Sequence, residues 1–169
     1  GNSLSFLGDN LATSVTLTST GPTGGIAYNT AADAHIISAT ADTGDITLTT
    51  TSLPPAFLGL GTITASAGNV TVTAEHAILD DNGAALNITG QNIWLTSNGG
   101  GSAGGLAISM DTQASGWIKA KVNGGVGGIA IRNAGDFGPA FNASNYFDLD
   151  DSAAASGNSV GFHTAGNLD

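Results

Sequence analysis

Short apolar segments recur in this chain at nearly constant intervals of roughly 20 to 25 residues. One series, spaced by roughly 23 to 25 residues, consists of Ile46, Val70, Ile93 and Ile118. A second series interleaves with it and consists of Ile63, Leu86, Leu106 and Ile129, with Ile88 and Ile108 as alternative members. A repeat of this length with two or three short strands is typical of a solenoid, whose coils bury their apolar rows only by stacking.

Within each repeat, apolar residues alternate with small or polar ones, as in Val70-Thr71-Val72-Thr73. This alternation is typical of half-buried strands, and the Gly, Asn and Asp residues between the runs indicate turns. The sequence therefore predicts an all-β fold, a right-handed parallel β-helix of about seven coils of roughly 23 residues. An antiparallel β-sandwich is the alternative, but it does not require one phase to recur at this interval.

Asn residues occupy equivalent positions in two consecutive repeats. Asn69 and Asn92 are one repeat apart, and each stands directly before a strand. Stacked side-chain amides can donate and accept hydrogen bonds from one coil to the next. We therefore expect these two residues to form a hydrogen-bonded ladder at one corner of the solenoid.

The whole chain, residues 1–169, is expected to be a single solenoid segment, most regular over 45–132. Residues 137–158 depart from the repeat and predict an irregular loop or a wide coil. Four rings fall at its start, Phe137, Phe141, Tyr146 and Phe147. They either fill a core or form an exposed recognition patch, since recognition residues tend to lie on loops that leave a regular scaffold.

The charge balance excludes several classes of function. Asp and Glu number 13 against three Lys and Arg, which gives a net charge of −10. No basic surface for nucleic acid can be built from three cations. No apolar run approaches the roughly 18 residues of a membrane span, and the absence of Cys excludes disulfides and thiolate metal sites. We expect no nucleic-acid partner, no membrane-spanning segment and no cofactor.

Two acidic clusters are weak candidates for a metal site: Asp80 with Asp81, and Asp148 with Asp150 and Asp151. Ca²⁺ takes several oxygen ligands, which carboxylates supply. The spacing matches neither an EF-hand loop nor the nonapeptide of calcium β-rolls. Turn residues that keep the surface charged are the simpler interpretation, so no metal is expected.

An enzyme that cleaves acidic polysaccharides would need a cation beside the substrate carboxylate and a base. All three cations of the chain, Lys119, Lys121 and Arg132, fall close together in the sequence, and Trp94 and Trp117 could stack on sugar rings. The cations would form a small positive region. The competing interpretation is a set of solvated strand charges. We expect no catalytic residues and retain a polysaccharide lyase or hydrolase as the alternative.

Residues 62–138 resemble the filamentous-haemagglutinin-like repeats of large bacterial exoproteins. The matching features are "GNVTVTA", "AILDDNGAALNITGQNIWLTS", a glycine-rich turn, "LAISM" and "GGIAIRNAGDFG". Proteins with such repeats are adhesins of two-partner secretion systems and autotransporter-type surface proteins. The resemblance implies a β-helical shaft that is secreted to, or displayed on, a bacterial cell surface with the help of an outer-membrane export partner.

The expected function is therefore that of a rigid adhesive module, which attaches to a glycan or protein on a host or neighbouring cell. Two alternatives remain open. The chain could be the subunit of a self-assembling extracellular filament that stacks end to end, because solenoid ends expose unpaired strand edges. It could also be a β-helical protein that binds or cleaves polysaccharides.

Overall fold

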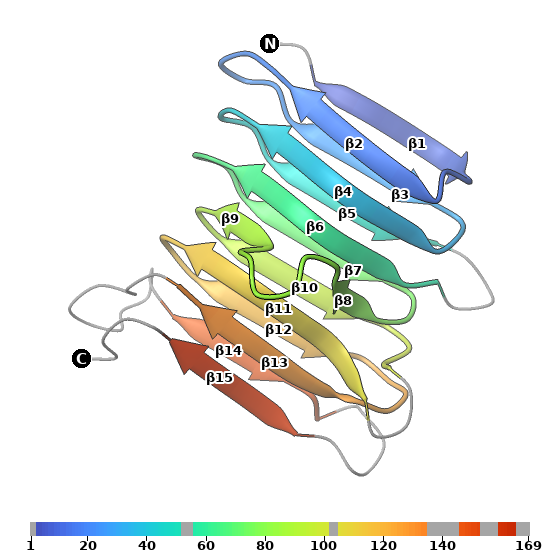
Figure 1. Cartoon of the computed structure of the whole chain (residues 1–169), viewed down its shortest axis with the longest axis vertical. Helices are drawn as coiled ribbons and strands as arrows, with labels where there is room; N and C mark the ends of the chain where they lie inside the picture. Colours follow the sequence, from blue (N-terminus) through green and yellow to red (C-terminus); the bar gives the residue numbers. More distant parts are fainter. Residues whose placement is uncertain (1–2, 52–55, 102–104, 135–145, 153–158, 165–169) are drawn as a thin grey trace.

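The computed structural model describes residues 3–51, 56–101, 105–134, 146–152 and 159–164, and in these residues the chain forms fifteen strands. The strands pair in parallel and build two sheets that face each other (Figure 1). Consecutive strands alternate between the sheets in most of the chain, so each coil adds a strand to both. No helix in this described part is long and apolar enough to cross a membrane.

Sheet A has seven strands in the order β1-β3-β5-β7-β10-β12-β14. Their bounds are β1 (Leu4–Asn10), β3 (Ile26–Thr30), β5 (Ile46–Thr50), β7 (Val70–Ala74), β10 (Ile93–Ser97), β12 (Ile118–Val122) and β14 (Phe147–Asp150).

Sheet B has the order β2-β4-β6-β8-β11-β13-β15, with β9 pairing between β6 and β11. Its strands are β2 (Ser14–Ser19), β4 (Ala34–Ala41), β6 (Leu58–Ala65), β8 (Ile78–Asp80), β9 (Ile88–Gly90), β11 (Leu106–Ala114), β13 (Gly128–Asn133) and β15 (Val160–Thr164).

The architecture is an all-β parallel solenoid, as the repeat predicts, with about five turns of roughly 24 residues. This number is smaller than the predicted one of about seven coils, which assumes that the repeat extends over all 169 residues. The right-handed sense of the coil stays a prediction. Of the irregular segment 137–158, residues 146–152 are described, and they include β14, which pairs with β12 in register. The remainder of that segment lies outside the described residues.

Sheet A supplies its half of the core through rows of aligned, buried side chains. The first row consists of Ile26, Ile46, Val70, Ile93 and Ile118. The second consists of Tyr28, Leu48, Val72, Leu95 and Ala120. Each row is apolar because alternate residues of a strand face the same side, and stacking removes each side chain from water on both neighbouring coils.

Sheet B differs from the predicted second series at two positions. Leu106 is 37% exposed, because a register irregularity in β11 places it opposite Gly128 and brings Ile108 opposite the buried Ile129. Leu86 is only half-buried, and its neighbour Ile88 pairs with Ile63. Ile88 and Ile108 occupy the inward positions. The prediction that Leu86 and Leu106 are core residues is therefore wrong, and their alternatives Ile88 and Ile108 are confirmed.

The chain leaves sheet B between β8 and β9. Ile78 pairs with Ile108, and Ile88 pairs with Thr112. The segment from Ile78 to Ile88 is therefore longer than the segment of β11 that it faces, from Ile108 to Thr112. The extra residues 81–86 form an excursion, which returns to the sheet at the buried Asn87. The Asn87 amide donates to the Leu60 carbonyl at 2.7 Å and closes the loop onto the neighbouring coil.

Candidate functional site: the outer face of sheet A

The outer face of sheet A carries two rows of aligned side chains, which we call the sheet A strip. From β3 to β12 its members are Ala27, Asn29, Thr47, Thr49, Thr71, Thr73, Trp94, Thr96, Lys119 and Lys121. Methyl, amide, hydroxyl, aromatic and ammonium groups are present, but this strip contains no carboxylate. The strip therefore carries positive charge, whereas the molecule as a whole, with 13 acidic residues and three cations, is negative.

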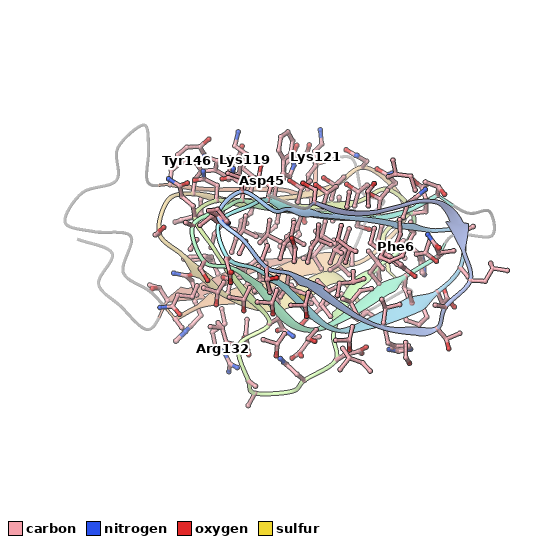
Figure 2. The ribbon with its side chains drawn as sticks, turned by 90° about the horizontal axis from the view of Figure 1, so that it is seen from above. Phe6, Asp45, Lys119, Lys121, Arg132 and Tyr146 are labelled. Carbon is pink, nitrogen blue, oxygen red and sulfur yellow. The ribbon has the colours of Figure 1, made fainter. Side chains whose placement is uncertain are left out.

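The three cations do not form one positive region. Lys119 and Lys121 project from the outer face of sheet A, whereas Arg132 projects from the opposite face of the molecule (Figure 2). The expectation of a single cationic region is therefore wrong. The physical reason is the coil itself, because β12 and β13 are consecutive strands that belong to different sheets.

Lys119 lies among three aromatic rings at one end of the strip, a group that we call the aromatic–lysine cluster. Its Nζ is 5.7 Å from the ring centroid of Trp94, 5.2 Å from that of Trp117 and 5.4 Å from that of Tyr146. Trp117 and Tyr146 stack with centroids 6.1 Å apart, and Trp94 meets Trp117 edge to face at 6.3 Å. An ammonium near ring faces is attracted by their quadrupoles, so the rings hold the Lys119 side chain in place.

A hydrogen-bonded ladder at the neighbouring corner positions Trp117. Asp45 accepts from the Asn69 side chain at 3.0 Å, and Asn69 accepts from Asn92 at 2.8 Å. Asn92 in turn accepts a hydrogen bond from the Trp117 backbone N–H at 3.1 Å. The predicted stacking of Asn69 and Asn92 is confirmed.

The second lysine has a carboxylate partner. Lys121 Nζ lies 3.8 Å from Asp150 Oδ2. Asp150 Oδ1 also accepts hydrogen bonds from the Ser152 hydroxyl at 2.5 Å and from the Ser152 backbone N–H at 2.9 Å. The pKa of Asp150 is lowered, first by the Ser152 hydroxyl and then by the Ser152 N–H, with a smaller contribution from Lys121. In the described residues no carboxylate lies within salt-bridge distance of Lys119.

Sheet B carries an open groove of about 570 Å³ on its outer face, beside the 81–86 excursion. Its floor includes the aligned residues Ser109, Ala130 and Gly161, and the groove is open there because these residues have small side chains or none. Arg132 borders it and forms a two-pronged pair with Asp111, Nε to Oδ1 at 2.8 Å and Nη2 to Oδ2. The Asp111 carboxylate raises the pKa of Arg132 through this hydrogen bonding and its charge. Because the guanidinium is bound to Asp111, neither group is available to a substrate without breaking the pair.

The five acidic candidates are dispersed over both sheets. Asp80 accepts hydrogen bonds from the backbone of Asn82 and Gly83, and Asp81 pairs with His35. Asp148 and Asp150 follow the two lysines of β12 in register on the sheet A side, and Asp151 lies just beyond β14. Within the described ranges no three His, Cys, Asp or Glu side chains converge as a metal site would require.

The proposed recognition patch falls partly on residues that the structure does not describe, since Phe137 and Phe141 lie in 135–145. Tyr146 belongs to the aromatic–lysine cluster. Phe147 stacks instead on Phe162 of sheet B, with centroids 4.3 Å apart. Phe147 aligns with the buried Ile118. The neighbouring residues Tyr146 and Phe147 therefore contact different parts of the molecule, the aromatic–lysine cluster and sheet B respectively. A link between Lys119 and Tyr146 was not visible in the sequence, because the two residues are separated by more than one repeat.

Comparison with known proteins returns no match for this chain: no protein-family model, no curated protein and no solved structure is significantly similar to it.

Proposed function

We propose that this chain is an attachment module of a secreted or surface-displayed bacterial exoprotein of the filamentous-haemagglutinin type. It acts by presenting a rigid surface to a glycan or protein on another cell, and it performs no catalysis. The observation that carries the proposal is the sheet A strip, which from β3 to β12 carries no carboxylate on a molecule of net charge −10. Acidic residues, Asp148 and Asp150, continue its rows only on β14.

The strip suits weak, repeated contacts. Thr49, Thr73 and Thr96 are aligned on consecutive coils, so their hydroxyls recur at the spacing of the strands, about 4.8 Å. Each hydroxyl can donate one hydrogen bond and accept up to two. A partner that engages several coils at once gains avidity from many weak contacts. The net negative charge of the rest of the molecule repels the anionic surfaces of cells, which leaves this face as the one that can approach them.

The test places one carboxylate on the strip and one on the other sheet. Thr73 in β7 and Thr64 in β6 are both half-buried, outward-facing threonines, so Thr73→Asp and Thr64→Asp make the same chemical change. Beads coated with the protein should attach to cultured epithelial cells or to bacterial cells. Thr73→Asp should lower attachment and Thr64→Asp should not. The proposal fails if coated beads attach no better than bare beads, or if both variants lose attachment equally.

Self-association is a second candidate function, favoured by the apolar side chains of the first described coil. Phe6 is 43% exposed, Leu7 78% and Leu11 72%. Among the described strands β1 pairs with β3 alone, and its other edge could accept a strand of a second copy. Sedimentation over a range of concentrations tests this: a Leu7→Lys, Leu11→Lys variant should stay monomeric where the parent protein associates.

A further inference from the structure

We propose that the aromatic–lysine cluster binds a carboxylated sugar, such as a uronic acid, within a glycan chain. The inference rests on the proposed attachment function and names its ligand. It is carried by the geometry of Lys119, Trp94, Trp117 and Tyr146, which come from three different coils and meet on one face.

The rings supply the surface on which a sugar can stack. Trp94 is 47% exposed on the outer face of β10, and Trp117 and Tyr146 are each half-buried beside it. One face of a pyranose ring presents several C–H bonds of partial positive charge, and the face of an aromatic ring is partially negative. Trp94, the exposed ring of the cluster, therefore offers a surface for the C–H face of a sugar, and the polar side chains beside it can pair with the sugar hydroxyls.

Lys119 supplies the charge that selects an acidic sugar. Of the three cations, Lys121 is near Asp150 and Arg132 is paired with Asp111. Lys119 aligns with Asp148 on β14, but no described carboxylate is within salt-bridge distance of its ammonium. The three rings restrict its ammonium, so a ligand carboxylate would meet a donor that is already positioned. A charge-assisted hydrogen bond from this ammonium is stronger than one from a hydroxyl.

The surroundings favour a polysaccharide over an acidic peptide. One common way for an extended peptide to gain affinity is to add a strand to an open sheet edge. β10 and β12, which carry Trp94 and Lys119, are paired on both sides and offer no such edge. Thr71 aligns with Trp94, and Thr96 aligns with Lys121, so hydroxyls lie beside the cluster to pair with the hydroxyls of a sugar.

The chain provides its own reporter for the test. Its two tryptophans, Trp94 and Trp117, are both in the cluster, so intrinsic tryptophan fluorescence reports on this site alone. The probes are polygalacturonate, the same polymer with its carboxyl groups methyl-esterified, and poly-glutamate of similar length. Titrations are run at physiological ionic strength, where charges farther away than the Debye length of about 8 Å are largely screened.

Three variants remove one positive charge each from different places: Lys119→Met, Lys121→Met and Arg132→Met. We expect polygalacturonate to change the fluorescence of the parent protein, and Lys119→Met to raise the Kd about tenfold or more. Arg132→Met, on the opposite face, should change the Kd less than about twofold, although it alters the net charge equally. Lys121→Met, whose lysine belongs to the sheet A strip but lies near Asp150, should weaken binding less than Lys119→Met does. Trp94→Leu, which keeps an apolar side chain but removes the ring, should also raise the Kd, with Trp117 as the remaining reporter.

Circular dichroism and the melting temperature establish that each variant is folded. The proposal is overturned if polygalacturonate produces no saturable change, if its methyl ester binds equally well, or if the three charge variants weaken binding alike. It is also overturned if poly-glutamate binds as tightly as polygalacturonate, which would indicate a general polyanion site. Bead attachment separates the two proposals: attachment that persists in Lys119→Met refutes this site and leaves the attachment function standing.

Discussion

The side-chain amide of Asn92 donates a hydrogen bond to the side-chain oxygen of Asn69 on the preceding coil, at 2.8 Å. The ladder begins at Asp45 and ends at the backbone N–H of Trp117. At another corner Glu75, Asn98 and Asn123 repeat the arrangement, with distances of 2.8 and 2.9 Å. In both ladders a carboxylate accepts the first hydrogen bond, so each amide can point its donor toward the preceding coil.

Replacing Asn92 by Asp tests the ladder. The substitution keeps the oxygen that accepts from the Trp117 N–H but removes the donor to Asn69, and two oxygens would then face each other. We expect a loss of about 1 to 3 kcal/mol in the free energy of unfolding, measured by urea titration. Gln91→Glu makes the same charge change at an adjacent exposed side chain and should have little effect. Equal losses would show that charge, not the ladder, is responsible.

The stacked apolar row predicts a sharp contrast between neighbouring positions of β7. Val70 is fully buried between Ile46 and Ile93, whereas Thr71 faces outward. Val70→Asp would place an unpaired charge in the core and should cost more than about 4 kcal/mol, enough to prevent folding at physiological temperature. Thr71→Asp should leave the melting temperature nearly unchanged. A folded Val70→Asp protein of normal stability would contradict the inward placement of this row.

The regular spacing explains which parts of the fold the sequence could predict. Ile46, Val70, Ile93 and Ile118 recur because each coil must present an apolar residue at the same place to bury its neighbours' residues. The prediction of an inward Leu106 fails because a register irregularity adds one residue to β11 between Leu106 and Ile108. The alternating sequence pattern does not distinguish such a bulge from a continuous strand. Leu86 was misplaced because the 81–86 excursion interrupts the period.

The candidate site was less predictable, since it depends on where each coil turns. Arg132 follows Lys121 by about half of the repeat, and half a coil carries the chain to the opposite sheet. Lys119 and Trp94 were visible as outward residues of alternating strands. Tyr146 follows Trp117 at a distance in sequence longer than the regular interval, so only the register of β14 on β12 brings the two rings together.

Two glycines of β6 should respond differently to alanine. A Cβ on Gly61 would collide with the backbone carbonyl of Ile37, which cannot move without disturbing β4. A Cβ on Gly59 would meet the carboxylate of Asp81, the far end of a side chain that can move away and release His35. Gly61→Ala should cost about 1 to 3 kcal/mol of unfolding free energy. Gly59→Ala should cost less than about 1 kcal/mol, because the pair it breaks is partly exposed.

Chelation should leave the protein folded. Asp80 already accepts hydrogen bonds from Asn82 and Gly83, and Asp81 is paired with His35, so these carboxylates have protein partners without a metal. We expect EDTA, and likewise added Ca²⁺, to change the melting temperature by no more than about 2 °C, because a ligand stabilises a protein only by binding its folded state. A larger fall with EDTA that added Ca²⁺ reverses would instead place Ca²⁺ at one of the acidic clusters.

The carboxylate of Asp150 offers a test by titration. Its pKa is lowered chiefly by the Ser152 hydroxyl, so the folded protein holds the ionised form more strongly than the unfolded chain does. Stabilisation from this group is therefore present above the unfolded pKa of about 3.9 and is lost as the pH falls through the lower folded value.

Ser152→Ala should raise the pKa of Asp150 toward its ordinary value, as followed by NMR of the side-chain carboxyl carbon. Lys121→Met should raise it less, since the ammonium is 3.8 Å away and contributes less than Ser152. The reverse order would mean that the lysine, not the serine, governs this carboxylate.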